Sequence, residues 1–167
     1  QIVVKDIFRK KFFFWSQYLT NIDTVIHLAW ILKKDFYQSK TNKICYLGTI
    51  ELAKACKAKN IKRFISIGSC AEYLWNNKIL TTKSKLRSNS NYSKYKILTY
   101  KNLIKLFSKK TKFVWLRPFF VFGKYQKNHQ LYPSILDKYL RKKKIIIFNL
   151  KNQYDFVPID FLCKFII

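Results

Sequence analysis

A tyrosine and a lysine four residues apart, Tyr92 and Lys96, are the pair with the clearest chemical potential in this sequence. On a helix this spacing puts both side chains on one face, within reach of a shared ligand. An ammonium group beside a phenol stabilises the phenolate and lowers the pKa of the phenol, by one unit for each 1.4 kcal/mol or so. The pair would then exchange protons near neutral pH. With 11 Tyr and 29 Lys in the chain, such spacings also arise by chance, so the pair alone does not decide the function.

Two further segments place polar residues where strands are expected to end. Ser69 closely follows the apolar run 63–67, so we expect its hydroxyl at the carboxyl end of a strand, the edge at which α/β folds bind ligands. The run 112–116 leads in the same way into a loop that begins with Arg117. A hydroxyl at one strand end, a Tyr and Lys pair on the next helix and a strand ending in arginine form a more specific pattern than the pair alone.

The elements that must position these residues follow from the hydrophobic period. Short runs rich in β-branched residues alternate with segments of helical length, as in a parallel sheet covered by helices. The runs are 2–4, 24–29, 63–67, 112–116 and 144–148. Apolar residues recur at helical spacing over 44–55, and a second helix is predicted over about 92–107. The sequence therefore predicts a doubly wound α/β domain.

The sequence has only three glycines, Gly48, Gly68 and Gly123. A dinucleotide-binding α/β domain normally opens with a strand, a Gly-rich turn and a helix, because glycines let the backbone approach the pyrophosphate. The three glycines lie too far apart to make that turn. Either the chain is not a dinucleotide fold, or its first unit precedes Gln1. Because the chain has no methionine and ends within the apolar run 161–167, we expect a fragment.

Positive charge dominates the composition, since 34 Lys and Arg oppose 8 Asp and Glu, a formal net charge of +26. One interpretation is a basic nucleic-acid-binding module. However, 29 of the cations are Lys and are scattered, whereas proteins that contact phosphates or bases favour Arg and gather their charge on one face. Apolar residues make up 49% of the chain and aromatic residues 18%, which excludes a disordered basic tail. We therefore interpret the charge as compositional drift over a solvated surface.

Simple counts argue against several other classes. The four cysteines, at positions 45, 56, 70 and 163, form no CxxC pair and indicate neither a zinc ribbon nor a disulfide framework. His27 and His129 are the only histidines, and no metal site is predicted. No apolar run reaches the roughly 18 residues that span a bilayer, and the first residues lack the pattern of a secretion signal. We expect a cytoplasmic protein with reduced thiols.

On these motifs the sequence resembles the extended short-chain dehydrogenase/reductases, in particular the NAD-dependent epimerase/dehydratase family, which acts on nucleotide sugars. Tyr92 and Lys96 match the YxxxK motif, and residues 117–123 match the RPxxxxG motif. The other matching segments are 5–7, 23–29, 47–55, 62–69 and 153–160. The resemblance implies that residues 1–167 form a partial, Rossmann-like NAD(P)-binding domain. Its first βαβ unit and most of its C-terminal substrate lobe would be missing, with the start of that lobe at about residue 124.

The resemblance also implies roles for single residues. Tyr92 would be the general acid or base, Lys96 would lower the pKa of the phenol and hold the nicotinamide ribose, and Ser69 would hydrogen-bond the reacting oxygen. These three are the implied catalytic residues. The implied binding residues for NAD or NADP are Asp6, Ile7, His27, Leu28, Ala29, Tyr92, Lys96 and Pro118. The implied substrate-binding residues are Ser69, Cys70, Glu72, Phe119 and Phe120.

Departures from the family pattern bear on the substrate. The 4,6-dehydratases carry an Asp-Glu pair directly after the catalytic hydroxyl, where Cys70 and Ala71 stand here with Glu72 one position late, so dehydration is disfavoured. Residues 27–30 and 68–73 instead resemble bacterial 4-keto-sugar nucleotide reductases and epimerases of surface-polysaccharide pathways. We expect a nucleotide-sugar substrate and, for the full-length protein, a homodimer. The alternatives are the nucleic-acid-binding module and a non-catalytic remnant of the family.

Overall fold

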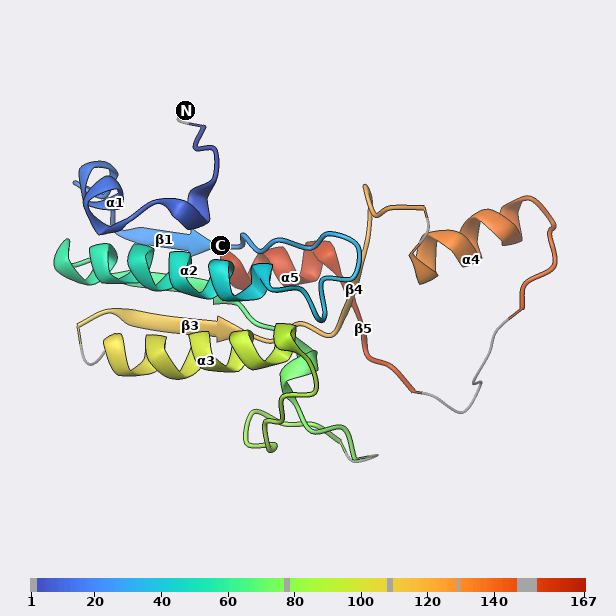
Figure 1. Cartoon of the computed structure of the whole chain (residues 1–167). Helices are drawn as coiled ribbons and strands as arrows, with labels where there is room; N and C mark the ends of the chain where they lie inside the picture. The colour runs from blue at the N-terminus through green and yellow to red at the C-terminus, as the bar shows by residue number, and fades with distance from the viewer. Residues whose placement is uncertain (1–2, 77–78, 108–109, 129, 147–152) are drawn as a thin grey trace. The chain divides into compact units, whose positions relative to one another are not determined.

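A parallel sheet of three strands organises the first of the two units into which the chain divides, Gln1–Arg117 and Pro118–Ile167 (Figure 1). The computed structural model describes residues 3–76, 79–107, 110–128, 130–146 and 153–167. The strands of the sheet are β1 (Thr24–His27), β2 (Arg63–Ile67) and β3 (Lys112–Leu116). Hydrogen bonds join them in the order β1-β2-β3, and His27 pairs with Ser66, which pairs with Trp115. The segments that follow the three strands therefore emerge at one edge of the sheet.

Two long helices connect these strands, α2 (Thr41–Ala58) between β1 and β2 and α3 (Asn91–Leu106) between β2 and β3. A capping box begins α3, because Ser90 Oγ accepts a hydrogen bond from Ser93 N and Ser93 Oγ accepts one from Ser90 N, each 3.1 Å long. These bonds satisfy N–H groups that a helix start leaves free. The cap fixes where α3 starts, and so where its first-turn residues lie.

The core of this unit lies where β2 packs against α2 and α3. Phe64 on β2 is fully buried, and its ring centroid lies 4.9 Å from that of Phe107. Ahead of the sheet, the 3-10 turn η1 (Ile7–Arg9) and helix α1 (Phe12–Tyr18) pack on α2. A Cβ on Gly48 would lie 2.5 Å from the backbone of η1, so only glycine allows this approach.

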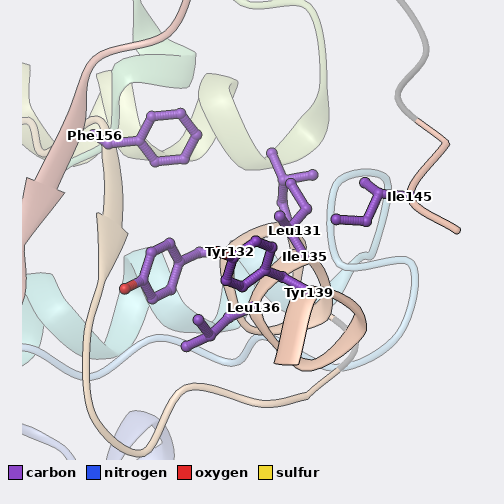
Figure 2. A pocket seen from close by; sticks show the side chains of 7 residues that line it. All are labelled: Leu131, Tyr132, Ile135, Leu136, Tyr139, Ile145 and Phe156. Atoms are coloured by element: carbon purple, nitrogen blue, oxygen red, sulfur yellow. The ribbon is translucent and has the colours of Figure 1, made fainter. Parts of the chain in front are cut away.

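The second unit contains a pair of short parallel strands and two helices. Their bounds are β4 (Phe120–Phe122), α4 (Leu131–Leu140), β5 (Phe156–Pro158) and α5 (Ile159–Ile166). One face of α4 borders an apolar cavity of about 320 Å³ (Figure 2). The residues that line this cavity are Leu131, Tyr132, Ile135, Leu136, Tyr139, Ile145 and Phe156.

The prediction of a Rossmann-like α/β fold with a parallel sheet is confirmed. The runs 24–29, 63–67 and 112–116 contain β1, β2 and β3, and both predicted helices are present. Two predicted strands are wrong where the structure describes them, because Val3, Val4 and residues 144–146 are not in strands. The rest of these two runs, Ile2, Ile147 and Phe148, lies outside the described residues. Within the described ranges, no helix combines the length and apolar character needed to cross a bilayer.

Candidate functional site

The loop after β2 carries Ser69 at the carboxyl edge of the sheet. Ser69 begins the 3-10 turn η2 (Cys70–Glu72), where its Oγ accepts a hydrogen bond of 3.2 Å from Ala71 N. Its own N–H donates to Glu72 Oε1 at 2.8 Å, which completes a capping box. The Ser69 side chain is also hydrogen-bonded to the side chain of Tyr92. The structure therefore brings together the serine and the tyrosine that the sequence placed more than twenty positions apart.

Tyr92 lies in the first turn of α3 and is only 8% exposed. Three aromatic rings enclose it, with centroid distances of 6.2 Å to Trp30, 5.0 Å to Phe36 and 5.7 Å to Tyr37. Burial raises the pKa of Tyr92 to about 12, while the hydrogen bond to Ser69 acts in the opposite direction. The sequence predicted a lowered pKa for this phenol, so the structure corrects that expectation.

The reason lies in the environment of Lys96. The two side chains do share one helix face, but Lys96 Nζ donates a 2.6 Å hydrogen bond to the carbonyl oxygen of Ile67. Nζ lies 3.9 Å from the ring centroid of Trp30 and 5.8 Å from that of Tyr92. Lys96 is 4% exposed, and burial lowers its pKa to about 7, against opposing effects of Glu72 and Cys45. A lysine that is only partly protonated and bound to a carbonyl does not stabilise the phenolate strongly.

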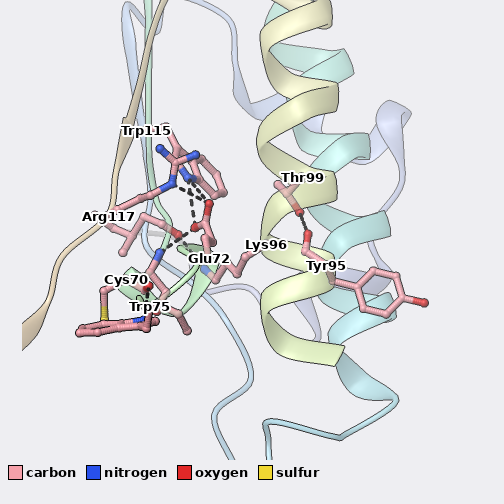
Figure 3. Close-up of polar contacts among 11 residues, drawn as sticks. Cys70, Glu72, Trp75, Tyr95, Lys96, Thr99, Trp115 and Arg117 are labelled. Carbon is pink, nitrogen blue, oxygen red and sulfur yellow. Dashed lines mark hydrogen bonds and ion pairs between the residues drawn. The ribbon is translucent and has the colours of Figure 1, made fainter. Parts of the chain in front are cut away.

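Glu72 anchors the loop that carries Ser69. Its side chain has no exposed surface, and its Oε2 accepts a 2.7 Å hydrogen bond from Arg117 Nε (Figure 3). Trp115 Nε1 donates to the same carboxylate at 3.2 Å, and Ser69 N donates at 2.8 Å. Its carboxylate is thus enclosed and bound to these three donors, and the contact of Glu72 with the substrate stays a prediction. The pair with Arg117 ties the loop after β2 to the end of β3.

His27, the last residue of β1, is held in one tautomer. Thr49 Oγ1 donates to Cys45 O at 2.8 Å, so its single hydrogen is used. His27 Nε2, 2.8 Å from Thr49 Oγ1, must then be the donor of that bond, which leaves Nδ1 without a proton. Burial, and then the charge of Lys96, lower the pKa of His27 to about 4. This histidine is therefore neutral at physiological pH.

The lowered pKa of His27 predicts acid sensitivity. We expect the free energy of unfolding to fall as the pH decreases from 6.5 to about 4, because the unfolded chain binds a proton there that the folded chain does not. A shift of this size corresponds to roughly 3 kcal/mol. Chemical denaturation at several pH values measures it, and His27→Gln, which keeps a donor for Thr49, should flatten the slope. An equally steep slope in the variant would assign the acid sensitivity to other groups.

The remaining residues predicted to bind the cofactor lie in different places. Ile7, Leu28 and Ala29 line, together with His27, a cavity of about 430 Å³ beside β1. Asp6 is exposed and is not among the residues that line it; its φ of 50° places it in the left-handed region. These cofactor roles remain predictions.

The other predicted residues are divided between the two units. Cys70 follows Ser69 in η2 and is half-buried, and its carbonyl accepts a 3.2 Å hydrogen bond from Trp75 Nε1. Pro118, Phe119 and Phe120 belong to the second unit, where the Phe120 ring packs 4.6 Å from that of Tyr154. Their roles, and the start of a substrate lobe at about residue 124, stay predictions. In the part of the chain that the structure describes, which does not include His129, no three His, Cys, Asp or Glu are grouped to hold a metal.

The sequence did not single out Trp30 or Asn42 as single residues of the site. Trp30 contacts both Tyr92 and Lys96, and its Nε1 donates a 2.8 Å hydrogen bond to the buried Asn42 Oδ1. Neither residue shows a spacing that points to a partner, since α3 begins 61 positions after Trp30 and 49 positions after Asn42. The only signal in the sequence was the resemblance of residues 27–30 to nucleotide-sugar reductases and epimerases. That resemblance did not show that Trp30 would contact Tyr92 and Lys96, because the contact arises from the fold.

A parallel sheet with serine, tyrosine and lysine at its carboxyl edge defines the class, a Rossmann-like domain of the short-chain dehydrogenase/reductase type. The profile of the NAD dependent epimerase/dehydratase family matches residues 10–167, and the chain belongs to this family. A search of curated protein sequences gives no match.

Solved structures show the same fold. The UDP-N-acetylglucosamine 4-epimerase from Methanobrevibacter ruminantium M1, in complex with UDP-N-acetylmuramic acid, superposes with a TM-score of 0.83 and 24% identity, over 98% of this chain and 55% of that one. The UDP-glucuronic acid 4-epimerase from Bacillus cereus, in complex with UDP-glucuronic acid and NAD, superposes with a TM-score of 0.75 and 26% identity. The match covers 96% of this chain and 52% of that one. A dTDP-glucose 4,6-dehydratase double mutant from Streptomyces venezuelae with NAD bound superposes with a TM-score of 0.76 and 19% identity. The match covers 96% of this chain and 51% of that one. The chain thus spans about half the length of these proteins.

The donor groups fit one end of a dinucleotide. Lys96 Nζ and the hydroxyls of Tyr92 and Ser69 are grouped at the end of β2, where they could hold a ribose and the reacting oxygen. The cavity lined by residues 25–29 of β1 and its following loop is largely apolar, and β1 is the neighbour of β2 in the sheet. The chain's three widely separated glycines supply no turn for a pyrophosphate. These residues therefore fit the nicotinamide side of such a cofactor and not its diphosphate.

Proposed function

We propose that this chain carries the catalytic residues of an NAD- or NADP-dependent enzyme that epimerises or reduces a nucleotide-linked sugar, with reduction of a 4-keto sugar favoured. The observation that carries the proposal is the convergence of Ser69, Tyr92 and Lys96 at the carboxyl end of β2. Family membership and the UDP sugars and NAD bound to the similar structures support it.

The proton chemistry would be performed by Tyr92. A bound nicotinamide supplies or accepts the hydride. The raised pKa of Tyr92 keeps its hydroxyl protonated at neutral pH, so the phenol can give a proton to the oxygen of a keto sugar. Ser69, hydrogen-bonded to the phenol, would donate to the same oxygen. This protonation state supports the reductive direction.

The finer assignments belong to the same proposal. Cys70 and Ala71, in place of an acid pair after Ser69, argue against dehydration. We also propose a role in surface-polysaccharide synthesis, on the resemblance to reductases and epimerases of those pathways, and a homodimer of the full-length protein. A cytoplasmic location is proposed from the four cysteines, which form no disulfide framework. Light scattering of the full-length protein tests the dimer.

The function is tested with the full-length protein and a small set of substrates. UDP-N-acetylglucosamine and UDP-glucuronic acid are incubated with NAD, and the epimeric products are followed by NMR. A UDP-4-keto sugar is incubated with NADH or NADPH, and loss of the reduced nicotinamide absorbance is followed. We expect turnover in at least one reaction. A folded full-length protein that turns over none of them and binds neither cofactor would refute the proposal.

A further inference from the structure

The ammonium group of Lys96 lies in an environment that offers little to a cation. The side chain is 4% exposed, and burial of a charge is costly unless hydrogen bonds or opposite charges replace water. Its hydrogen bond to Ile67 O replaces one water contact. The carboxylate of Glu72 is already paired with Arg117 at 2.7 Å. Another source of stabilisation is needed for the protonated form of Lys96 to be populated at neutral pH.

The face of Trp30 supplies it. Lys96 Nζ lies 3.9 Å from the ring centroid, which is a close cation–π contact. The indole is fixed, because its Nε1 donates to Asn42 Oδ1 at 2.8 Å. Asn42 is fully buried and its Nδ2 donates to Phe36 O and Ser39 O, at 2.7 and 2.9 Å, so its oxygen faces the indole. The side chain that contacts Lys96 is thus itself locked in place.

The same indole also contacts Tyr92. The two rings meet edge to face with their centroids 6.2 Å apart. We propose that Trp30, locked by Asn42, is the positioning residue that favours the protonated form of Lys96 and directs its side chain to the end of β2 beside Tyr92. This inference rests on the proposed function for its catalytic meaning, and on the contacts of Lys96 for its physical content.

The titratable groups around Lys96 contribute little to stabilising its ammonium form, so the contact with Trp30 contributes a large part of that stabilisation. Glu72 faces it from η2, Cys45 from α2, His27 from β1 and Tyr92 from α3. Burial raises the pKa of Cys45, the pKa of His27 is about 4, and that of Tyr92 about 12, so all three are neutral near pH 7. The fourth group, Glu72, forms an ion pair with Arg117.

The test measures the titration of Lys96 directly, by NMR of lysines labelled with ¹³C at Cε, with Lys96→Met to assign the signal. In the full chain, Trp30→Leu removes the ring, and we expect the pKa of Lys96 to fall by about one unit. Asn42→Leu should lower it less. Trp30→Phe keeps a smaller ring and a fold close to the original, and should give a small fall. Phe113→Leu, which thins the core without touching Lys96, should give no shift.

The outcomes separate this inference from the proposed function, because the titration needs neither cofactor nor substrate. A pKa of Lys96 that is unchanged or raised in both Trp30→Phe and Trp30→Leu overturns the inference, even if the full-length protein is active. If Trp30→Leu does not fold, Trp30→Phe alone decides. If the pKa of Lys96 falls in the Trp30 variants but the full-length protein is inactive, the contact between Trp30 and Lys96 is supported and only its catalytic role is lost. In an active protein, the acid or base limb of the kcat profile should move in Trp30→Phe together with the pKa of Lys96.

Discussion

Tyr92→Phe is expected to lower kcat of the full-length protein by at least 10²-fold and by as much as about 10⁴-fold, the range in which general acid–base catalysis contributes. The substitution removes only the hydroxyl that would transfer the proton. The ring, packed among Trp30, Phe36 and Tyr37, is retained, so the fold should be preserved. Steady-state kinetics with a nucleotide sugar that the full-length protein turns over measure the loss of kcat, and circular dichroism measures whether the fold is preserved.

A matched control lies three residues further along α3. The Tyr95 ring lies 5.9 Å from the ring of Tyr46, and in Figure 3 it points away from the group around Glu72. Tyr95→Phe should leave kcat within a factor of about two, as expected for a hydroxyl with no part in proton transfer. Equal losses in both variants, or none in Tyr92→Phe, would contradict the assignment of Tyr92.

The second large effect concerns the stability of the first unit. Arg117→Met leaves the carboxylate of Glu72 fully buried without its partner, and breaking a buried pair in this way typically costs about 3–5 kcal/mol. Urea denaturation followed by tryptophan fluorescence measures the loss. The double variant Glu72→Gln with Arg117→Met should be less destabilised than Arg117→Met alone, because no uncompensated charge remains in the core.

An exposed ion pair of the same unit serves as the control. Lys62 Nζ lies 3.0 Å from Asp23 Oδ1, with side chains 75% and 71% exposed. Lys62→Met should cost less than about 1 kcal/mol, as surface pairs usually do. If Arg117→Met costs no more than Lys62→Met, the buried pair does not hold the Ser69 loop in the way described.

The sheet of the first unit could be predicted because its strands are largely apolar runs of four or five residues, with β-branched and aromatic side chains, bounded by helical segments. The second unit offered no such signal. β4 and β5 have three residues each and pair Phe120 with Phe156 across a long separation in sequence, so neither length nor period identifies them. Their pairing depends on tertiary contacts and not on a local pattern.

For the site, the order of the motifs predicted that Ser69, Tyr92 and Lys96 would gather, because parallel strands end at one edge. Their protonation states could not be predicted. These depend on the aromatic rings that exclude water from Tyr92, and on the Ile67 carbonyl that holds Lys96. The same holds for Glu72, whose partner Arg117 lies 45 positions away in the sequence.

The open edge of the sheet has a consequence for the behaviour of the chain in solution. Among the described residues β1 pairs only with β2, and Ile26 in β1 and Leu28 just after it are 45% and 57% exposed. Such an edge is a template for pairing with another copy. At low ionic strength the net charge of +26 keeps copies apart, but salt shortens the range of that repulsion. The colloidal stability of the isolated chain should therefore fall as salt is added.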